Sequence, residues 1–260
     1  MAQTSTADKR LTLETQGALA RVTFTHPPLN VFDFRQMDEL SDALKQIEQR
    51  PEISAAILTG GDRAFSAGVD VAVHTPELVP EMLRKFHALI LCVAKFPKIT
   101  LAEVHGACLG GGAELAMVCD LCFTAEESKW GFPEVTLGCY PPVACTALAA
   151  LVGEKRAADL IFTGRTFSGS EAAAWGLANE ACAESEIDAA IKRTLDHLLK
   201  LSPAALACAK KAFYAWDSIH LDKGLARAEK IYLEELMRTE DAKEGVQAWM
   251  EKRKPLWKGR

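Results

Sequence analysis

The chain has 260 residues, of which 49% are hydrophobic and 25% are charged, a composition typical of globular proteins. Its 35 Asp and Glu residues outnumber 30 Lys and Arg, and the net charge of -5 argues against nucleic-acid binding as the main function. The polar N-terminus predicts no secretory signal and no apolar run is long enough to span a bilayer, so we expect a cytoplasmic protein without a membrane partner.

Strands and helices are predicted to alternate along the first 200 residues. Short apolar or alternating runs that end in turn residues predict strands, and apolar residues at helical spacing predict helices. In chain order, the predicted elements are strands at 11–16, 18–27, 55–60, 99–106 and 121–128, and helices at 34–49 and 76–96. This alternation favours an α/β fold with a layered core.

The pattern changes near Ser202. Residues 202–216 and 221–254 are helical in periodicity, and no strand is predicted between them. We therefore expect a core over residues 1–200 and a C-terminal helical region over 201–260.

The eight cysteines are scattered through hydrophobic segments, which predicts reduced core residues in a chain without a signal peptide. Cys119 and Cys122 have the spacing of a redox pair or half of a zinc site. No second pair of this kind and no suitable His–His spacing accompanies them, so we favour structural cysteines and no metal site.

Three consecutive glycines, residues 110–112, join a predicted strand to a predicted helix. Glycines and the unpaired N–H groups of a helix start can together bind an anion, either a phosphate or a carbonyl oxygen that becomes negative during a reaction. The segment lacks both the P-loop lysine and the GxGxxG pattern. A second glycine-containing loop at 60–71 offers another N–H group, although such glycines equally permit simple tight turns.

Two glutamates are candidate acid or base groups. Glu114 lies in the first turn of the helix after the glycines, where the helix dipole alone favours an acid. Glu134 lies beside Trp130 and Phe132, and apolar neighbours raise the pKa of a carboxyl group, which suits proton donation. An ion pair with an arginine is the alternative for Glu134, and His105 is expected to be structural.

Several ordered motifs together resemble the crotonase (enoyl-CoA hydratase/isomerase) superfamily. They cover nearly the whole chain and comprise PPLNVF at 27–32, AFSAGVDV at 64–71, VHGACLGGGAELAMVCD at 104–120, KWGFPEVTLG at 129–138, FTGRTFSGSEAAAWGLANE at 162–180 and EGVQAWMEKRKPLW at 244–257. The resemblance implies a spiral of repeated ββα units with a C-terminal helical trimerisation region. It also implies an acyl-CoA substrate and a homotrimer or a hexamer made of two trimers.

The resemblance also implies roles for individual residues. The two oxyanion-hole N–H groups match Ala67 and Gly111, and the two hydratase carboxylates match Glu114 and Glu134. Further contacts with the substrate or its CoA moiety are expected from Ser66, Gly68, Asp70, Gly110, Tyr140 and Lys254. Lys252, Arg253 and Lys254 either reach the CoA phosphates or form a solvated helix end. No cofactor is expected, because CoA is part of the substrate.

The segment GCYPPVACTALAAL, residues 138–151, departs from the glycine-rich segment of simple enoyl-CoA hydratases. Pro142, Ala144 and Cys145 replace glycines, and together with Tyr140 they predict a stiff wall for a particular acyl group. This resembles the subgroup that hydrates cyclohexa-1,5-diene-1-carbonyl-CoA in anaerobic aromatic degradation, by 1,4-addition to 6-hydroxycyclohex-1-ene-1-carbonyl-CoA. A generic short-chain 2-enoyl-CoA hydratase and a non-catalytic CoA- or RNA-binding protein are the alternatives. Glu103 is unexpected, because relatives usually have a small residue there.

Overall fold

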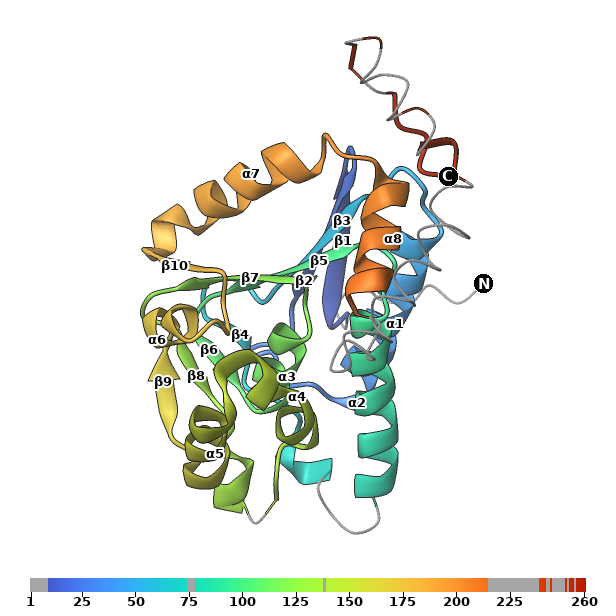
Figure 1. Ribbon diagram of the computed structural model, residues 1–260. Helices are drawn as coiled ribbons and strands as arrows, with labels where there is room; N and C mark the ends of the chain where they lie inside the picture. The colour runs from blue at the N-terminus through green and yellow to red at the C-terminus, as the bar shows by residue number, and fades with distance from the viewer. Residues whose placement is uncertain are drawn as a thin grey trace, which may run out of the picture.

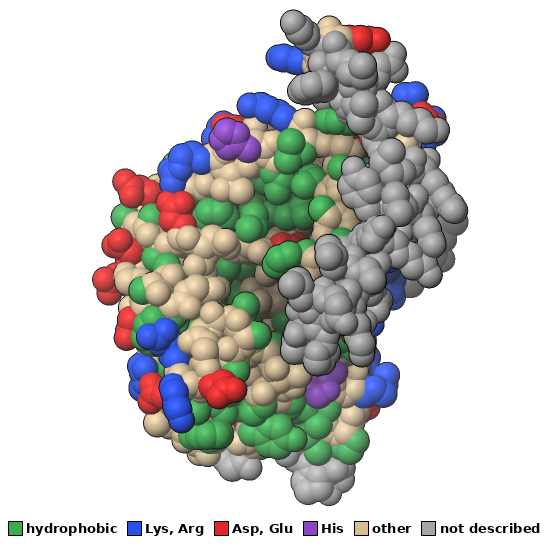
Figure 2. Space-filling model, viewed as in Figure 1, with side chains coloured by type: hydrophobic (Ala, Val, Ile, Leu, Met, Phe, Trp, Pro, Cys, Tyr) green, Lys and Arg blue, Asp and Glu red, His purple; other side chains and the backbone are tan. Residues whose placement is uncertain are grey.

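Figure 1 shows the fold of this computed structural model, in which strands occupy the centre and helices cover them. The structure describes residues 9–73, 78–137, 139–214, 239–241, 244, 251, 253–254 and 256–260. Figure 2 shows that charged side chains of both signs gather along the edge of one face, while hydrophobic side chains lie nearer its middle.

The larger sheet has six strands in the order β1-β2-β3-β5-β7-β10. Its first pair is antiparallel and the remaining pairs are parallel. The strands are β1 (Leu11–Gln16), β2 (Leu19–Phe24), β3 (Ala55–Thr59), β5 (Ile99–Val104), β7 (Leu121–Ala125) and β10 (Glu180–Cys182). All five residues of β3 are buried, as expected for a central strand covered on both faces.

A smaller sheet of four short strands has the order β4-β6-β8-β9. Its strands are β4 (Ala64–Ser66), β6 (Ala107–Leu109), β8 (Lys129–Gly131) and β9 (Thr166–Ser168). Three times the chain passes from the larger sheet into the smaller one, from β3 to β4, from β5 to β6 and from β7 to β8, before it enters a helix or a 3₁₀ turn. This repetition places the ends of β4, β6 and β8 next to one another.

The helices lie around the two sheets (Figure 1), except that α3, whose residues are all buried, lies inside the fold. They are α1 (Phe34–Glu48), α2 (Val79–Ala94), α3 (Gly111–Met117), α4 (Pro142–Val152), α5 (Glu154–Thr163), α6 (Gly169–Ala174), α7 (Ile187–Leu198) and α8 (Pro203–Phe213), with 3₁₀ turns η2 (Val71–Val73), η3 (Pro133–Leu137) and η4 (Glu184–Glu186). A large apolar core includes residues of both sheets, and a smaller one lies between the larger sheet and α7.

Asp120 joins α8 to the larger sheet. Its Oδ2 accepts hydrogen bonds from the Thr100 N–H at 2.7 Å and from the Thr100 hydroxyl at 2.9 Å, and it lies 2.7 Å from Nζ of Lys210. The side chains of Lys210 and Asp120 are only 5% and 10% exposed. Asp120, in the CDLC motif, is thus a nearly buried anchor, and Cys119 and Cys122 of this motif are both buried.

The predicted α/β fold of the crotonase type is confirmed, and each predicted strand and helix of the first 200 residues has a counterpart. Several boundaries differ, and the strands predicted over 99–106 and 121–128 end at Val104 and Ala125. The second strand ends at Phe24, before the two prolines, and the helix predicted over 76–96 begins at Val79 and ends at Ala94. Residues 74–77 lie outside the described part of the chain.

The C-terminal region is described only in part. Helix α8 agrees with the prediction for 202–216, whereas most of the helix predicted over 221–254 lies outside the described residues, so the division near residue 200 stays a prediction. Within the described ranges, no helix has the length and apolarity needed to cross a membrane. Those same ranges contain no group of His, Cys, Asp or Glu side chains suited to a metal ion.

Candidate active site

The loop after β4 is held in place by Asn30, from the PPLNVF segment. The amide of Asn30 donates 2.8 Å hydrogen bonds to the carbonyl oxygens of Gly60 and Ala64, at the two ends of the β3–β4 connection. The Ser66 hydroxyl donates to the carbonyl of Asn30 at 2.7 Å and accepts the Gly68 N–H at 3.1 Å. The Ser66 side chain is therefore used inside the loop, and only its backbone remains for the predicted CoA contact.

The structure contradicts the prediction that Ala67 donates an oxyanion-hole N–H. Its N–H donates a 2.9 Å hydrogen bond to the carbonyl of Leu29 and is not available to a ligand. Two residues later, Val69 forms a parallel bridge with Phe32. The Phe32 N–H donates to the Gly68 carbonyl, and the Phe32 carbonyl accepts the Asp70 N–H. In such a bridge the N–H of the middle residue points to the opposite side, so the Val69 N–H is directed away from Phe32.

The start of α3 packs directly against this loop. A Cβ on Gly68 would lie 3.3 Å from the Gly111 nitrogen, and a Cβ on Gly111 would lie 2.9 Å from both Val69 Cγ2 and Phe86 Cζ. Gly110 donates its own N–H to the Gly131 carbonyl at 2.9 Å. The N–H of Gly111, as the first residue of α3, has no intrahelical acceptor. The Val69 and Gly111 amides thus belong to two loops in contact.

Glu114 lies in the first turn of α3 and is 2% exposed. Its Oε1 accepts 2.9 Å hydrogen bonds from the N–H groups of Val143 and Ala144, at the start of α4. Burial raises the pKa of Glu114 to about 7, the two N–H donors oppose this rise, and the charge of Glu134 adds to it. Glu134 is therefore close enough to Glu114 for its charge to favour the protonated form of Glu114.

Glu134 lies in η3, between the buried aromatic residues Trp130 and Phe132 and the start of α4. Its Oε2 is buried without a hydrogen-bond partner. Burial raises the pKa of Glu134, as the apolar neighbours in the sequence predicted. Oε1 lies over the backbone of Gly110, where a Cβ would come within 2.6 Å, so a side chain at residue 110 would displace this carboxylate.

The remaining residues predicted to contact the substrate or CoA are Asp70, Tyr140 and Lys254, and they differ in exposure and in partners. Oδ1 of Asp70 accepts the Ala72 N–H at 3.0 Å. Tyr140 is 65% exposed, so its ring is open to a ligand but is not packed into the wall. Lys254 is exposed, and Arg253 beside it contacts Glu244 at 2.6 Å. Lys252 lies outside the described residues.

The wall segment 139–145 contains the start of α4. Pro142 occupies the first turn of this helix, where its missing N–H costs no intrahelical hydrogen bond. This segment thus provides a helix start whose N–H groups bind Glu114. Cys145 is exposed on this helix, and both Glu114 and Glu134 raise the pKa of its thiol, after burial as the larger cause.

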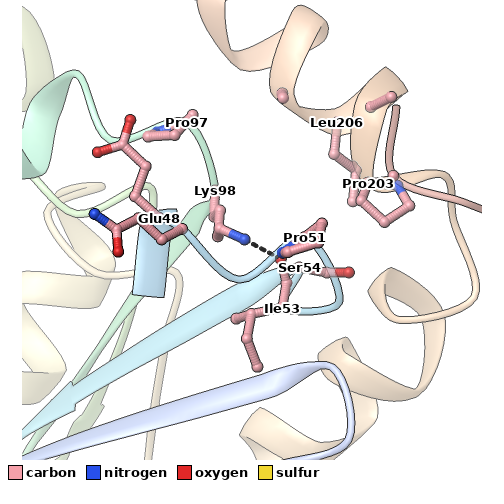
Figure 3. A pocket seen from close by; sticks show the side chains of 12 residues that line it. Glu48, Pro51, Ile53, Ser54, Pro97, Lys98, Pro203 and Leu206 are labelled. Atoms are coloured by element: carbon pink, nitrogen blue, oxygen red, sulfur yellow. Dashed lines mark hydrogen bonds between the residues drawn. The ribbon is translucent and has the colours of Figure 1, made fainter. Parts of the chain in front are cut away.

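A separate cavity of about 280 Å³ lies between the start of α8 and the segment before β3 (Figure 3). Lys98 crosses it and donates to the carbonyl of Ile53 at 2.7 Å. Neither glutamate lines this cavity, and its lysine is already bound to backbone oxygens. The chemistry described above is therefore located elsewhere, where the ends of β4 and β6 meet η3 and α4.

Comparisons with known proteins agree with this geometry. The family model described as enoyl-CoA hydratase/isomerase matches residues 14–260. The chain belongs to the enoyl-CoA hydratase/isomerase family. It is 34% identical over 248 residues to cyclohexa-1,5-dienecarbonyl-CoA hydratase of Thauera aromatica, covering 95% of this chain and 96% of the relative. It is 36% identical over 247 residues to a probable enoyl-CoA hydratase of Bacillus subtilis (strain 168), covering 93% and 95%.

A solved structure of this family has the same fold. The crystal structure of enoyl-CoA hydratase from Bacillus anthracis matches with a TM-score of 0.90 and 29% identity, over 97% of this chain and 100% of that one. The prediction of an enzyme, a hydro-lyase of the enoyl-CoA hydratase type, is confirmed, and the family implies an acyl-CoA substrate. The oligomeric state stays a prediction.

Proposed function

We propose that this hydratase adds water to a conjugated acyl-CoA thioester, with Glu114 and Glu134 as the acid–base pair. The observation that carries the proposal is the placement of two carboxyl groups, buried Glu114 and half-buried Glu134, at one end of the smaller sheet, where burial raises both pKa values. A carboxyl group whose pKa is raised in this way can both accept and donate a proton.

The two amides of Val69 and Gly111 are proposed to bind the thioester oxygen. Electron density moves onto this oxygen when water attacks the β-carbon, and the removal of one such donor typically costs about 3 kcal/mol of transition-state stabilisation. Val69 replaces Ala67 in this role because the Ala67 N–H is bound to Leu29. The backbone of Gly68 lies beside the Gly111 nitrogen and supports the pairing of the two loops.

The roles of the carboxyl groups follow from their surroundings. Glu114 is the base, because two N–H donors from α4 stabilise its ionised form and fix Oε1, which leaves Oε2 for the water. Glu134 is the acid, because the N–H donors that stabilise an ionised carboxylate bind Glu114, and the buried Oε2 of Glu134 has no hydrogen-bond partner among the described residues. The C–O bond forms at the β-carbon while Glu114 takes one proton of the water and Glu134 delivers another to the substrate.

The proposed acyl group is cyclohexa-1,5-diene-1-carbonyl. The 34% identity to the Thauera aromatica hydratase and the helical wall that begins at Pro142 support this choice. In a 1,4-addition the proton from Glu134 would reach the far end of the conjugated diene. A short-chain 2-enoyl group is the second candidate, supported by the 36% identity to the Bacillus subtilis relative.

The test is a panel of CoA thioesters followed by absorbance and product mass. Conversion of the cyclic dienoyl-CoA to a product heavier by one water, at a higher kcat/KM than crotonyl-CoA, is the expected result. Fast hydration of crotonyl-CoA without activity on the diene would replace the cyclic substrate by the short-chain one. Failure to hydrate any thioester, combined with salt-sensitive RNA binding, would favour the non-catalytic alternative.

A further inference from the structure

His105 lies between two carboxylates that come from separate elements. Its Nε2 is 3.3 Å from Oε1 of Glu103, and its Nδ1 is 3.4 Å from Oε1 of Glu184. The side chains of His105 and Glu103 are nearly buried, whereas that of Glu184 is 60% exposed. An imidazole donates from both nitrogens only when it is protonated. The arrangement therefore matches the cationic form of His105, which joins β5 to η4.

Further groups surround this charged cluster. Arg21 of β2 contacts Oε2 of Glu103 at 2.7 Å and Asp188 of α7 at 3.7 Å. From β3, the Thr59 hydroxyl lies 3.4 Å from Glu103 Oε1. The neighbouring strand β7 presents the uncharged Phe123 and Thr124 opposite residues 103 and 104, and Lys129 of β8 reaches Gly106 only through its backbone N–H. Glu103 is thus a buried partner of Arg21 and His105.

The backbone of His105 connects this cluster to both loops of the proposed site. Its carbonyl accepts the Phe65 N–H of β4 at 2.9 Å, and Gly106 forms an antiparallel bridge with Ala64. A Cβ on Gly106 would overlap the Arg63 carbonyl, so the chain before β4 rests directly on this turn. Strand β6 begins at Ala107, directly after this turn, and leads to the glycines of α3.

We propose that His105 is a positioning residue whose protonated ring, held between Glu103 and Glu184, fixes the point where β4 and β6 leave the larger sheet. The separation of the Val69 and Gly111 amides depends on that point. The inference rests on the proposed function, because it assigns a positioning role for those two amides. His105 does not act on the substrate, and the neutral ring, with one N–H, donates to only one of its two carboxylates.

The direction of the pH effect follows from the contacts. The hydrogen bond to Glu103 is the largest cause that raises the pKa of His105, and burial opposes it. The charged bridge is complete below the ordinary histidine pKa of about 6.5 and is lost as the pH rises through the higher pKa of the folded protein. The two amides therefore lose their fixed separation at alkaline pH.

The decisive variant is Glu184→Gln, because Glu184 lies at the surface and outside the proposed acid–base pair. We expect NMR titration to place the His105 pKa lower by about half a unit, since one partially exposed carboxylate is removed. The alkaline limb of kcat should move to lower pH by the same amount, while KM at pH 6 is unchanged. Asp188→Asn is the matched control, because Asp188 contacts Arg21 but not His105.

Two results would overturn the proposal: an unchanged His105 titration in Glu184→Gln, or a shifted titration with an unmoved kcat limb. Hydrogen exchange of the Phe65 amide and of residues 106–112 tests the positioning role of His105 separately from the proposed function. The protection of these amides, relative to their intrinsic exchange rates, should fall above the His105 pKa, and at lower pH in Glu184→Gln than in the wild type. This readout needs no substrate, so it judges the positioning role even if no thioester is hydrated, and unchanged exchange would refute it.

Discussion

The N–H of Ala144 donates a 2.9 Å hydrogen bond to Oε1 of Glu114, which fixes a carboxylate on α3 to the first turn of α4. A second N–H, from Val143, binds the same oxygen. Such donors normally lower the pKa of a carboxyl group, yet burial raises that of Glu114 to about 7. The bond therefore holds the proposed base in one orientation while it remains able to change protonation at neutral pH.

Replacing Glu114 by Gln removes the proposed base and keeps a carbonyl oxygen for the two α4 donors. We expect kcat to fall at least about 100-fold, the usual range for loss of a general base, while the Kd for a CoA thioester changes little. Steady-state kinetics and calorimetry measure the two quantities. Glu127→Gln, at an exposed position, is the control, and full activity of Glu114→Gln would refute the assignment.

The same substitution should stabilise the protein at alkaline pH. A carboxyl whose pKa is raised in the folded state binds its proton more tightly than in the unfolded state, so stability is lost as the pH rises from about 4.3 towards 7. Relative to wild type, the free energy of unfolding of Glu114→Gln should increase by about 3 kcal/mol between pH 5 and pH 8.5. Urea denaturation at both values measures it, and an equal difference at the two pH values would contradict a raised pKa.

The role of the Val69 amide can be isolated by an ester bond in place of the amide at residue 69, which removes the N–H and retains the side chain. We expect kcat to fall about 100-fold, as for other oxyanion donors. An ester at residue 67 is the matched control, because the Ala67 N–H binds the Leu29 carbonyl. Its loss should lower Tm and leave kcat close to the wild-type value. The reverse pattern would restore Ala67 as the donor.

Gly110→Ala should displace the proposed acid. The added Cβ would lie 2.6 Å from Oε1 of Glu134, so the carboxylate must move, and we expect kcat to fall by about tenfold or more. Gly17→Ala shares the positive φ, +57° against +50°, but its Cβ would meet no atom within 4 Å. Gly110, at φ 50° and ψ -127°, lies outside the left-handed helical region, so Gly110→Ala should also lose stability from backbone strain. Equal kcat values in the two would argue against a catalytic position for Glu134.

Asp120→Asn should loosen the attachment of α8. The substitution leaves the Lys210 ammonium buried without its carboxylate, and breaking a buried pair typically costs about 3–5 kcal/mol. Chemical denaturation measures the loss. The control is Asp196→Asn, which breaks the exposed pair with Lys192 at 2.7 Å and should cost less than about 1 kcal/mol. Similar losses in both variants would contradict the anchoring role.

The long elements were predictable from the sequence because their apolar residues repeat over many positions. Helix α1 is an example, since Met37, Leu40, Leu44 and Ile47 are all buried as their spacing indicates. The three-residue strands β4, β6 and β8 were not predicted, because a segment of this length contains too little periodicity. The smaller sheet, which positions the proposed site, is therefore visible only in the structure.

The residue types of the site were predictable from the sequence, but the directions in which its backbone N–H groups point were not. The direction of the Val69 N–H depends on the bridge to Phe32, a distant residue in the sequence, and only the alternation of N–H groups along an extended segment hints at it. The contact between Glu103 and His105 could have been predicted from the sequence, because residues two positions apart share one face of a strand.

The bridge between Phe32 and Val69 also determines which sequence changes this loop can accept. A donor supplied by the main chain survives any substitution of the side chain that carries it, proline excepted, so the acyl wall at this position is free to change in size. Insertion or deletion of a single residue between 66 and 69 would instead turn that N–H to the other edge. The side chain at residue 69 can therefore change, whereas the length of the loop cannot.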